Sequence, residues 1–187
     1  MRKFKTFLFV ACAALFICVH AILPSKANDM LALSQVPQAA LVGKGDLKFF
    51  FKHVYEARLF APNGEWSGIL VAGEPVPQPF ALELIYGMGL KGADIARRSI
   101  IEMEKQGVSG DEKLARWQQS MLDIFPNVKD GTRLIGVMLA NGETTFFNGE
   151  QEIGTITDPE FGVAFFNIWL SDKTSEPALR QKLLGQL

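Results

Sequence analysis

The side chains that could carry chemistry in this 187-residue chain offer hydrogen bonds and charge, with few nucleophiles or metal ligands. Its two cysteines, Cys12 and Cys18, both fall within the first 27 residues, and beyond them a single histidine remains, His53. A multi-histidine metal site and a thiolate nucleophile are therefore not expected in residues 28–187. No Gly-x-Ser-x-Gly segment accompanies His53 to indicate a serine triad.

Four polar side chains are candidates for binding a ligand: Tyr55, Arg58, Tyr86 and Arg97. Tyr86 ends an alternating apolar run, so its hydroxyl could orient a ligand in an apolar cleft. The simpler interpretation of Tyr86 is a core tyrosine bonded to the backbone. Arg58 could bind a carboxylate through its guanidinium, or it could pair with Glu56 or Glu83 on the solvated side of a strand.

The spacing of these candidates limits how they could act together. Tyr55 and Arg58 are three positions apart, which places them on opposite faces of a strand. Arg97 borders the apolar stripe of a helix and could reach a cleft along its aliphatic stem, or it could lie on a solvated face. Arg98 is expected to point away from most of that stripe. His53 has no evident carboxylate partner and is interpreted as a structural or surface histidine.

Residues 1–27 have the layout of a secretory signal peptide. A basic start precedes an almost wholly apolar run over residues 6–23, and Ser25 and Ala27 supply small residues at the −3 and −1 positions of a cleavage site. A retained membrane anchor is the competing interpretation, since about 18 apolar residues are marginally long enough to span a bilayer. We expect cleavage after Ala27, a periplasmic protein and no remaining membrane span.

Removal of this leader makes the chain acidic. Four basic residues and no acidic ones leave with it, so 15 lysines and arginines face 20 aspartates and glutamates, a net charge of −5. Such a surface repels phosphate backbones, and no nucleic-acid partner is expected. Gly43-Lys44-Gly45 leads into a strand and not a helix, so it predicts no dinucleotide site. We expect no cofactor and no metal.

Apolar periodicity predicts the elements that position these residues. Residues 28–40 are interpreted as a lead-in segment and residues 41–187 as one domain. Alternation predicts strands over 47–52, 54–60, 80–86, 132–139, 144–147 and 153–156. Pro62-Asn63-Gly64 is expected to be the turn that closes the first pair of strands.

Helical spacing predicts two pairs of helices. Their apolar stripes are Ala93, Ala96, Ile100 and Met103; Leu114, Trp117, Met121 and Ile124; Phe161, Ala164, Phe165 and Ile168; and Leu179 with Leu183. Trp117, Trp169, Phe161 and Phe165 are expected to be core anchors. Ser109 to Glu112 fits a capping box, Asp158-Pro159 fits an N-cap with proline at N1, and Ser175 could cap the last helix. The order of elements predicts an α+β fold, a mainly antiparallel sheet covered on one face by helices.

Local sequences spread along the chain occur together in a known family. They are Gly43-Lys44-Gly45, Val54-Tyr55-Glu56-Ala57-Arg58-Leu59, Pro79-Phe80-Ala81-Leu82, Trp117 with Phe125-Pro126-Asn127-Val128 and Gly131, Asn148-Gly149, Asp158-Pro159-Glu160-Phe161, and Phe166-Asn167-Ile168-Trp169-Leu170 before Pro177-Ala178-Leu179-Arg180. Over residues 40–185 the chain resembles the chalcone-isomerase-like family, within it the exported bacterial branch. The resemblance implies an open-faced β-sandwich, a large antiparallel sheet on a layer of helices with a ligand cleft between them.

The catalytic residues of that family have no match here. The plant enzymes close a flavanone ring with an arginine before the Val-Tyr strand, a hydroxyl on that strand, and a Tyr, a Lys and an Asn on the first long helix. In residues 28–187 no arginine precedes Arg58, the strand hydroxyl falls near Phe50, and the helix positions fall near Lys91, Asp94 and Arg98. Chalcone isomerisation is therefore not expected. A second branch of the family binds fatty acids through an Arg and a Tyr, and that arginine is also missing.

These observations favour an exported, non-catalytic protein that holds a small apolar ligand, such as a fatty acid, between sheet and helices. An accessory protein acting by protein–protein contact is one alternative, and an apolar patch on the uncovered sheet face would indicate it. An isomerase or lyase that uses Tyr86, His53 or an arginine is the other. Phenylalanines such as Phe49, Phe50, Phe51 and Phe146 could fill the cleft.

Overall fold

The computed structural model describes residues 31–187, so the expected signal peptide at 1–27 lies outside the described residues. Six strands form one antiparallel sheet in the order in which they occur along the chain. They are β1 (Ala39–Phe49), β2 (Lys52–Pro62), β3 (Phe80–Tyr86), β4 (Arg133–Met138), β5 (Thr144–Asn148) and β6 (Gln151–Ile156). Every strand thus pairs only with its neighbours in sequence, as the predicted antiparallel sheet requires.

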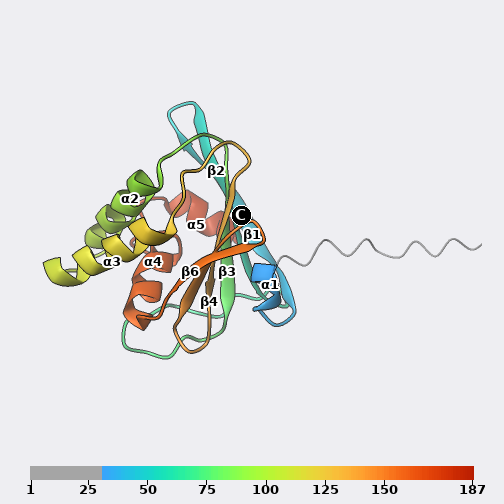
Figure 1. The fold of residues 1–187 in the computed structure, drawn as a ribbon. Coiled ribbons are helices and arrows are strands. Elements are labelled where there is room, and N and C mark those ends of the chain that lie inside the picture. The colour runs from blue at the N-terminus through green and yellow to red at the C-terminus, as the bar shows by residue number, and fades with distance from the viewer. Residues whose placement is uncertain (1–30) are drawn as a thin grey trace, which may run out of the picture.

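Four helices lie on one side of this sheet (Figure 1). They are α2 (Gly92–Lys105), α3 (Asp111–Ile124), α4 (Pro159–Leu170) and α5 (Pro177–Leu183). A helix of four residues, α1 (Leu31–Ser34), lies on the other side and contacts β4. The predicted α+β architecture, with a helical layer on one face, is confirmed. Among the described residues, no helix has the length and hydropathy needed to cross a membrane.

Alternation along β3 separates the two faces of the sheet. Phe80, Leu82, Leu84 and Tyr86 belong to the large core under the helices, and Ala81 belongs to a smaller cluster under α1. Because successive side chains of a strand point to opposite faces, the long alternating run predicted this division correctly.

Asp158 fixes where α4 begins and how it meets α3. Its Oδ1 accepts a hydrogen bond from the backbone N–H of Glu160 at 3.0 Å, with Pro159 in the first turn of the helix. Its Oδ2 accepts a second one from Nε1 of Trp117 on α3, at 2.8 Å. The predicted N-cap is therefore confirmed, and it also satisfies a buried indole. The four predicted aromatic anchors are all buried.

The first hairpin turns at a different place from the one predicted. Phe49 pairs with Lys52, so Phe50 and Phe51 form the turn, whereas Pro62 is the last residue of β2 and Asn63-Gly64 follows it. The prediction was wrong because Leu47, Phe49 and Phe51 fit the two-residue period of a continuous strand. Phenylalanine is also not a usual turn residue, so nothing in the sequence marked a turn here. The strand β1 also begins at Ala39, inside the segment interpreted as a lead-in.

Two predicted helix caps are absent from the described part of the chain. Helix α3 starts after Gly110, which has a φ of 109°, and no side chain caps it, so Ser109 and Glu112 form no capping box. Ser175 does not cap α5; its hydroxyl donates to Oε2 of Glu102 on α2, at 2.8 Å. A long-range contact thus overrides the local pattern at Ser175, and the start of α3 at Asp111 leaves Ser109 outside the cap position.

Helix α5 packs directly on β1. A Cβ built on Gly43 would overlap the carbonyl oxygen of Lys182, and one on Gly45 would lie 2.9 Å from Cδ1 of Leu179. The two glycines of the Gly-Lys-Gly segment therefore leave room for the backbone and side chains of α5.

Candidate ligand-binding pocket

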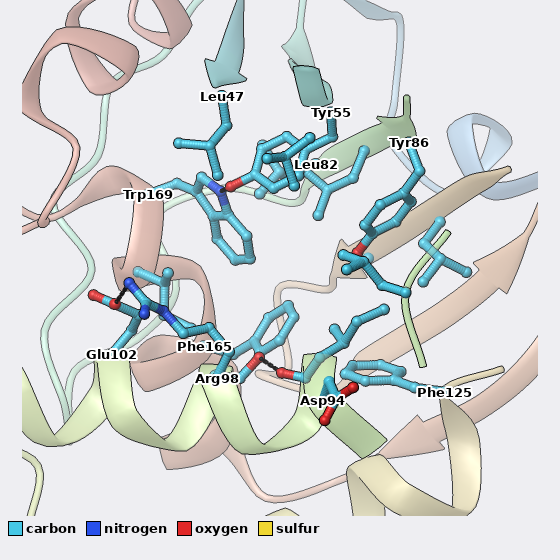
Figure 2. Close-up of a pocket in the computed structure, with 18 of the residues that line it drawn as sticks. Leu47, Tyr55, Leu82, Tyr86, Asp94, Arg98, Glu102, Phe125, Phe165 and Trp169 are labelled. Carbon is cyan, nitrogen blue, oxygen red and sulfur yellow. Dashed lines mark hydrogen bonds and ion pairs between the residues drawn. The ribbon is translucent and has the colours of Figure 1, made fainter. Parts of the chain in front are cut away.

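A pocket of about 340 Å³ lies between the sheet and helices α2 and α4 (Figure 2). Its apolar walls come from strands, from both helices and from the loops beside them; they include Leu47, Val54, Leu82, Leu84, Leu90, Ile95, Phe125, Leu134, Phe146, Phe165, Ile168 and Trp169. Phe146 is the only one of the four phenylalanines expected to fill the cleft that lines this pocket. The other three are exposed in and beside the β1–β2 turn, so they leave the space open.

Two tyrosines enter the pocket from the strands. Tyr55 on β2 pairs directly with Tyr86 on β3, and their rings meet edge to face with centroids 5.9 Å apart. The Tyr55 hydroxyl accepts a hydrogen bond from Nε1 of Trp169 at 3.0 Å. The Tyr86 hydroxyl has no hydrogen-bond partner within residues 31–187, although its side chain is buried. Burial raises the pKa of both phenols, so both remain protonated donors at neutral pH.

Charged side chains border the opposite wall along one row of α2, where Glu102 is buried and the Arg98 side chain is 64% exposed (Figure 2). Asp94, Arg98 and Glu102 follow one another at four-residue spacing and all line the pocket. Glu102 accepts hydrogen bonds from Nζ of Lys105 at 2.9 Å and from Ser175, and it forms an ion pair with Arg98. Burial alone would raise the pKa of Glu102, but these hydrogen bonds and the charge of Arg98 lower it. Glu102 is therefore ionised, and its charge is shared among three partners.

A family model described as chalcone isomerase-like matches residues 34–185. The chain belongs to the chalcone isomerase-like family. Among solved structures, the chain is similar to the crystal structure of a fatty-acid binding protein from Arabidopsis thaliana, with a TM-score of 0.56 and 12% sequence identity over 79% of this chain and 87% of that one. At this identity the likeness establishes the fold. No curated protein sequence matches significantly.

Of the four residues predicted to bind a ligand, this chalcone isomerase-like chain brings only the two tyrosines together. Arg58 points to the sheet face away from the helices, where its Nε donates to Glu56 at 2.5 Å. Arg97 is largely exposed and pairs with Asp94 at 2.9 Å. Neither arginine lines the pocket. Simple strand alternation explains the place of Arg58, whose pairing with a glutamate was one of the interpretations.

Arg98 and His53 differ from expectation. Arg98 lines the pocket, although it lies outside the apolar stripe of its helix. Ala96, Ile100 and Met103 of the stripe are buried in the core, whereas Ala93 is exposed. A second row of the same helix, marked by the four-residue recurrence of Asp94, Arg98 and Glu102, borders the pocket. His53 does have a carboxylate partner, since its Nε2 lies 2.9 Å from Oδ1 of Asp46 across the hairpin. It does not line the pocket.

The sheet face away from the helical layer carries charge across several strands. Arg133 on β4 and Arg58 on β2 both approach the buried carboxylate of Glu83 on β3, and Lys44 on β1 pairs with Glu56 at 3.7 Å. A small apolar cluster beside these residues is covered by α1. Beside this cluster, Leu31 of α1 and Leu41 of β1 are exposed, the latter opposite Phe60. Within residues 31–187, no three side chains gather in a potential metal site.

Proposed function

We propose that this chalcone isomerase-like chain binds a small, largely apolar ligand, such as a fatty acid, between its sheet and helices α2 and α4. The observation that carries the proposal is the pocket of about 340 Å³ with apolar walls and the free hydroxyl of Tyr86. Small-molecule pockets commonly span about 300–1,000 Å³ and combine such walls with a few convergent polar groups. The fatty-acid binding protein with the same fold supports this choice of ligand class.

Arg98 is the group we propose for the polar end of the ligand. It is the one basic side chain among the residues that line the pocket. Glu102 has Lys105 and Ser175 as further partners, so it does not depend on Arg98 alone. A guanidinium carries five N–H donors, and those not directed at Glu102 can bind a carboxylate.

The ionisation of the lining groups favours binding over proton transfer. A general base at neutral pH needs a pKa near 7. The phenols of Tyr55 and Tyr86 have raised pKa values and stay protonated, whereas Glu102 has a lowered pKa and stays ionised. The three groups thus supply fixed donors and a fixed charge, which suits a non-catalytic site.

We also propose that the chain acts in the periplasm. The basic start, the apolar run over residues 6–23 and the small residues before position 28 support this location. An acidic chain without cysteine beyond residue 18 is compatible with an oxidising compartment because it has no thiol there to oxidise.

Native mass spectrometry of the purified chain, followed by solvent extraction, tests the proposal directly. We expect a stoichiometric apolar adduct, or uptake of one after incubation with a panel of fatty acids. Ile95→Trp, which places an indole in the pocket wall, should abolish the adduct. Ile101→Trp on the same helix lies outside the pocket and should retain it. A bare mass in every incubation, or equal binding by both variants, would contradict the proposal.

The role of Arg98 has its own test, with Arg97→Gln as the control on the same helix. Arg98→Gln should weaken binding of a long-chain fatty acid by about 3- to 10-fold, as expected for a partly solvated charge pair. Binding of the corresponding fatty alcohol should change little. Equal losses for acid and alcohol would show that Arg98 contributes packing and not charge recognition.

A further inference from the structure

The tip of the β1–β2 hairpin exposes three consecutive aromatic rings. Phe49, Phe50 and Phe51 are 68%, 83% and 100% exposed, and the first two contact each other with ring centroids 4.6 Å apart. Figure 1 shows this hairpin projecting beyond the rest of the sheet. Single exposed apolar residues are common on protein surfaces, but a contiguous apolar patch marks an interaction site.

One lysine precedes these three phenylalanines in the sequence and another follows them. Lys48 and Lys52 are exposed on either side of the three phenylalanines, and neither forms an ion pair within the described part of the chain. The tip is therefore basic and aromatic, whereas residues 28–187 as a whole are acidic. Phenylalanine side chains on interfacial elements bury at the boundary between headgroups and acyl chains, and lysine side chains extend from there toward lipid phosphates.

The turn has a phenylalanine at a backbone position that favours other residue types. Phe50 is the first of two turn residues and has a φ of 54°. Two-residue hairpin turns with a left-handed first position favour glycine or asparagine there, because a bulky side chain is strained in that region. A strained residue at an exposed tip is a reason to look for a function of its side chain.

The two strands that carry the tip also contribute residues to the wall of the pocket. Leu47 on β1 and both Val54 and Tyr55 on β2 line the pocket, and they lie only a few residues from the turn. From these observations we infer that the β1–β2 tip docks on a lipid bilayer with anionic headgroups, inserting Phe50 and Phe51 between the headgroups. This inference goes beyond the proposed function and does not depend on which ligand the pocket holds.

A protein partner fits the tip less well than a bilayer does. An aromatic side chain buries about 150–250 Å², so three of them provide less than the ~800 Å² that a stable protein interface buries on each side. A narrow projecting tip can insert between lipid headgroups without any such flat surface. A second copy of the chain or another protein is therefore an alternative outcome of the test.

Flotation of the processed chain with vesicles tests this inference. We expect binding to vesicles of phosphatidylethanolamine and phosphatidylglycerol, reduced about ten-fold or more by Phe50→Ser with Phe51→Ser. The control, Ile69→Ser with Val71→Ser, removes two exposed apolar side chains elsewhere and should bind normally. Lys48→Gln with Lys52→Gln should weaken binding to these vesicles but not the weaker binding to phosphatidylcholine vesicles. Unchanged thermal unfolding would show that the variants are folded.

A fluorescent label separates insertion from loose adsorption. Residues 28–187 contain no cysteine, so Phe51→Cys and Ile69→Cys each give one labelling site for an environment-sensitive dye. The dye at position 51 should shift to the blue with vesicles, and the dye at position 69 should not. The inference is overturned if neither dye responds, if the double serine variant floats as well as the parent, or if the tip only drives self-association in sedimentation.

Discussion

The hydroxyl of Tyr55 on β2 accepts a hydrogen bond from the indole of Trp169 on α4 at 3.0 Å, which joins the sheet to the helical layer between residues 114 positions apart. Tyr86 sits directly opposite Tyr55 on the next strand and is also buried, yet its hydroxyl has no protein partner among residues 31–187. One hydroxyl therefore holds two layers together, and the other is free to meet a ligand.

Phenylalanine substitutions should separate these two roles. Tyr55→Phe leaves the buried Trp169 N–H unpaired and should lower the free energy of unfolding by about 1–3 kcal/mol. Tyr86→Phe removes no protein hydrogen bond and should change that free energy by less than about 0.5 kcal/mol, while weakening ligand binding by about 2- to 10-fold. Urea unfolding and ligand titration of both variants are the measurements. Equal destabilisation by the two substitutions would contradict the different roles.

Alkaline pH should destabilise the fold through the same two residues. Burial raises the pKa of Tyr55, despite the opposing hydrogen bond from Trp169, and it raises the pKa of Tyr86. An unfolded tyrosine ionises near pH 10. Above this pH the unfolded state loses protons that the folded state keeps, so stability is intact below about pH 10 and falls above it.

The expected slope is up to about 1.4 kcal/mol per pH unit for each tyrosine. Urea unfolding at pH 9, 10 and 11 measures it. Tyr86→Phe removes one of the two groups and should make the fall shallower; a slope identical to that of the parent chain would show that Tyr86 does not contribute.

Packing of α5 on β1 predicts a severe effect at Gly43. Gly43→Ala places a methyl group against the carbonyl oxygens of Lys182 and Leu183, where backbone must move to make room. We expect a loss of about 1–3 kcal/mol in the free energy of unfolding. Gly89→Ala is the matched control, because its new Cβ would meet only the carbonyl oxygen of Val128 at 3.5 Å, an ordinary contact. Similar losses at both sites would refute a specific role for Gly43.

Export makes a prediction about the N-terminus of the protein. If the leader is removed after Ala27, the intact mass of periplasmic protein should correspond to a chain that begins at Asn28. Ala27→Arg replaces the small residue at the −1 position with a large charged one. It should therefore block cleavage and leave an unprocessed, membrane-associated chain. Unprocessed parent protein in the cytoplasm would exclude the proposed location.

The sheet could be predicted from the sequence because its signals are local. Strand β3 alternates cleanly, and the Asn-Gly turns at 141–142 and 148–149 mark the last hairpins. The turn at Phe50-Phe51 contains no glycine or asparagine that would indicate it. Its position depends on the register between β1 and β2, which pairs Phe49 with Lys52 through contacts that no short window of sequence contains.

The pocket was only half predictable for a similar reason. Tyr55 and Tyr86 lie on strands whose faces follow from alternation, so their place on the helix-facing side of the sheet could be predicted. Arg98 was missed because a helix presents several rows to its surroundings, and the apolar stripe reveals only the row packed on other helices. Which remaining row borders a cavity depends on how far the sheet lies from α2, and this distance is a property of the whole fold.

The contact between α5 and Gly43 has a consequence for how the molecule is made. Strands that pair only with their sequence neighbours have short-range contacts, so the sheet can form early in folding. Helix α5 is translated after every strand, yet it packs on β1, the first strand to emerge. A chain truncated before residue 177 would therefore contain every strand of the sheet but leave the part of β1 under α5 uncovered. The truncated product would also expose the surfaces of β2 and α4 that α5 covers, and quality-control proteases could recognise it there.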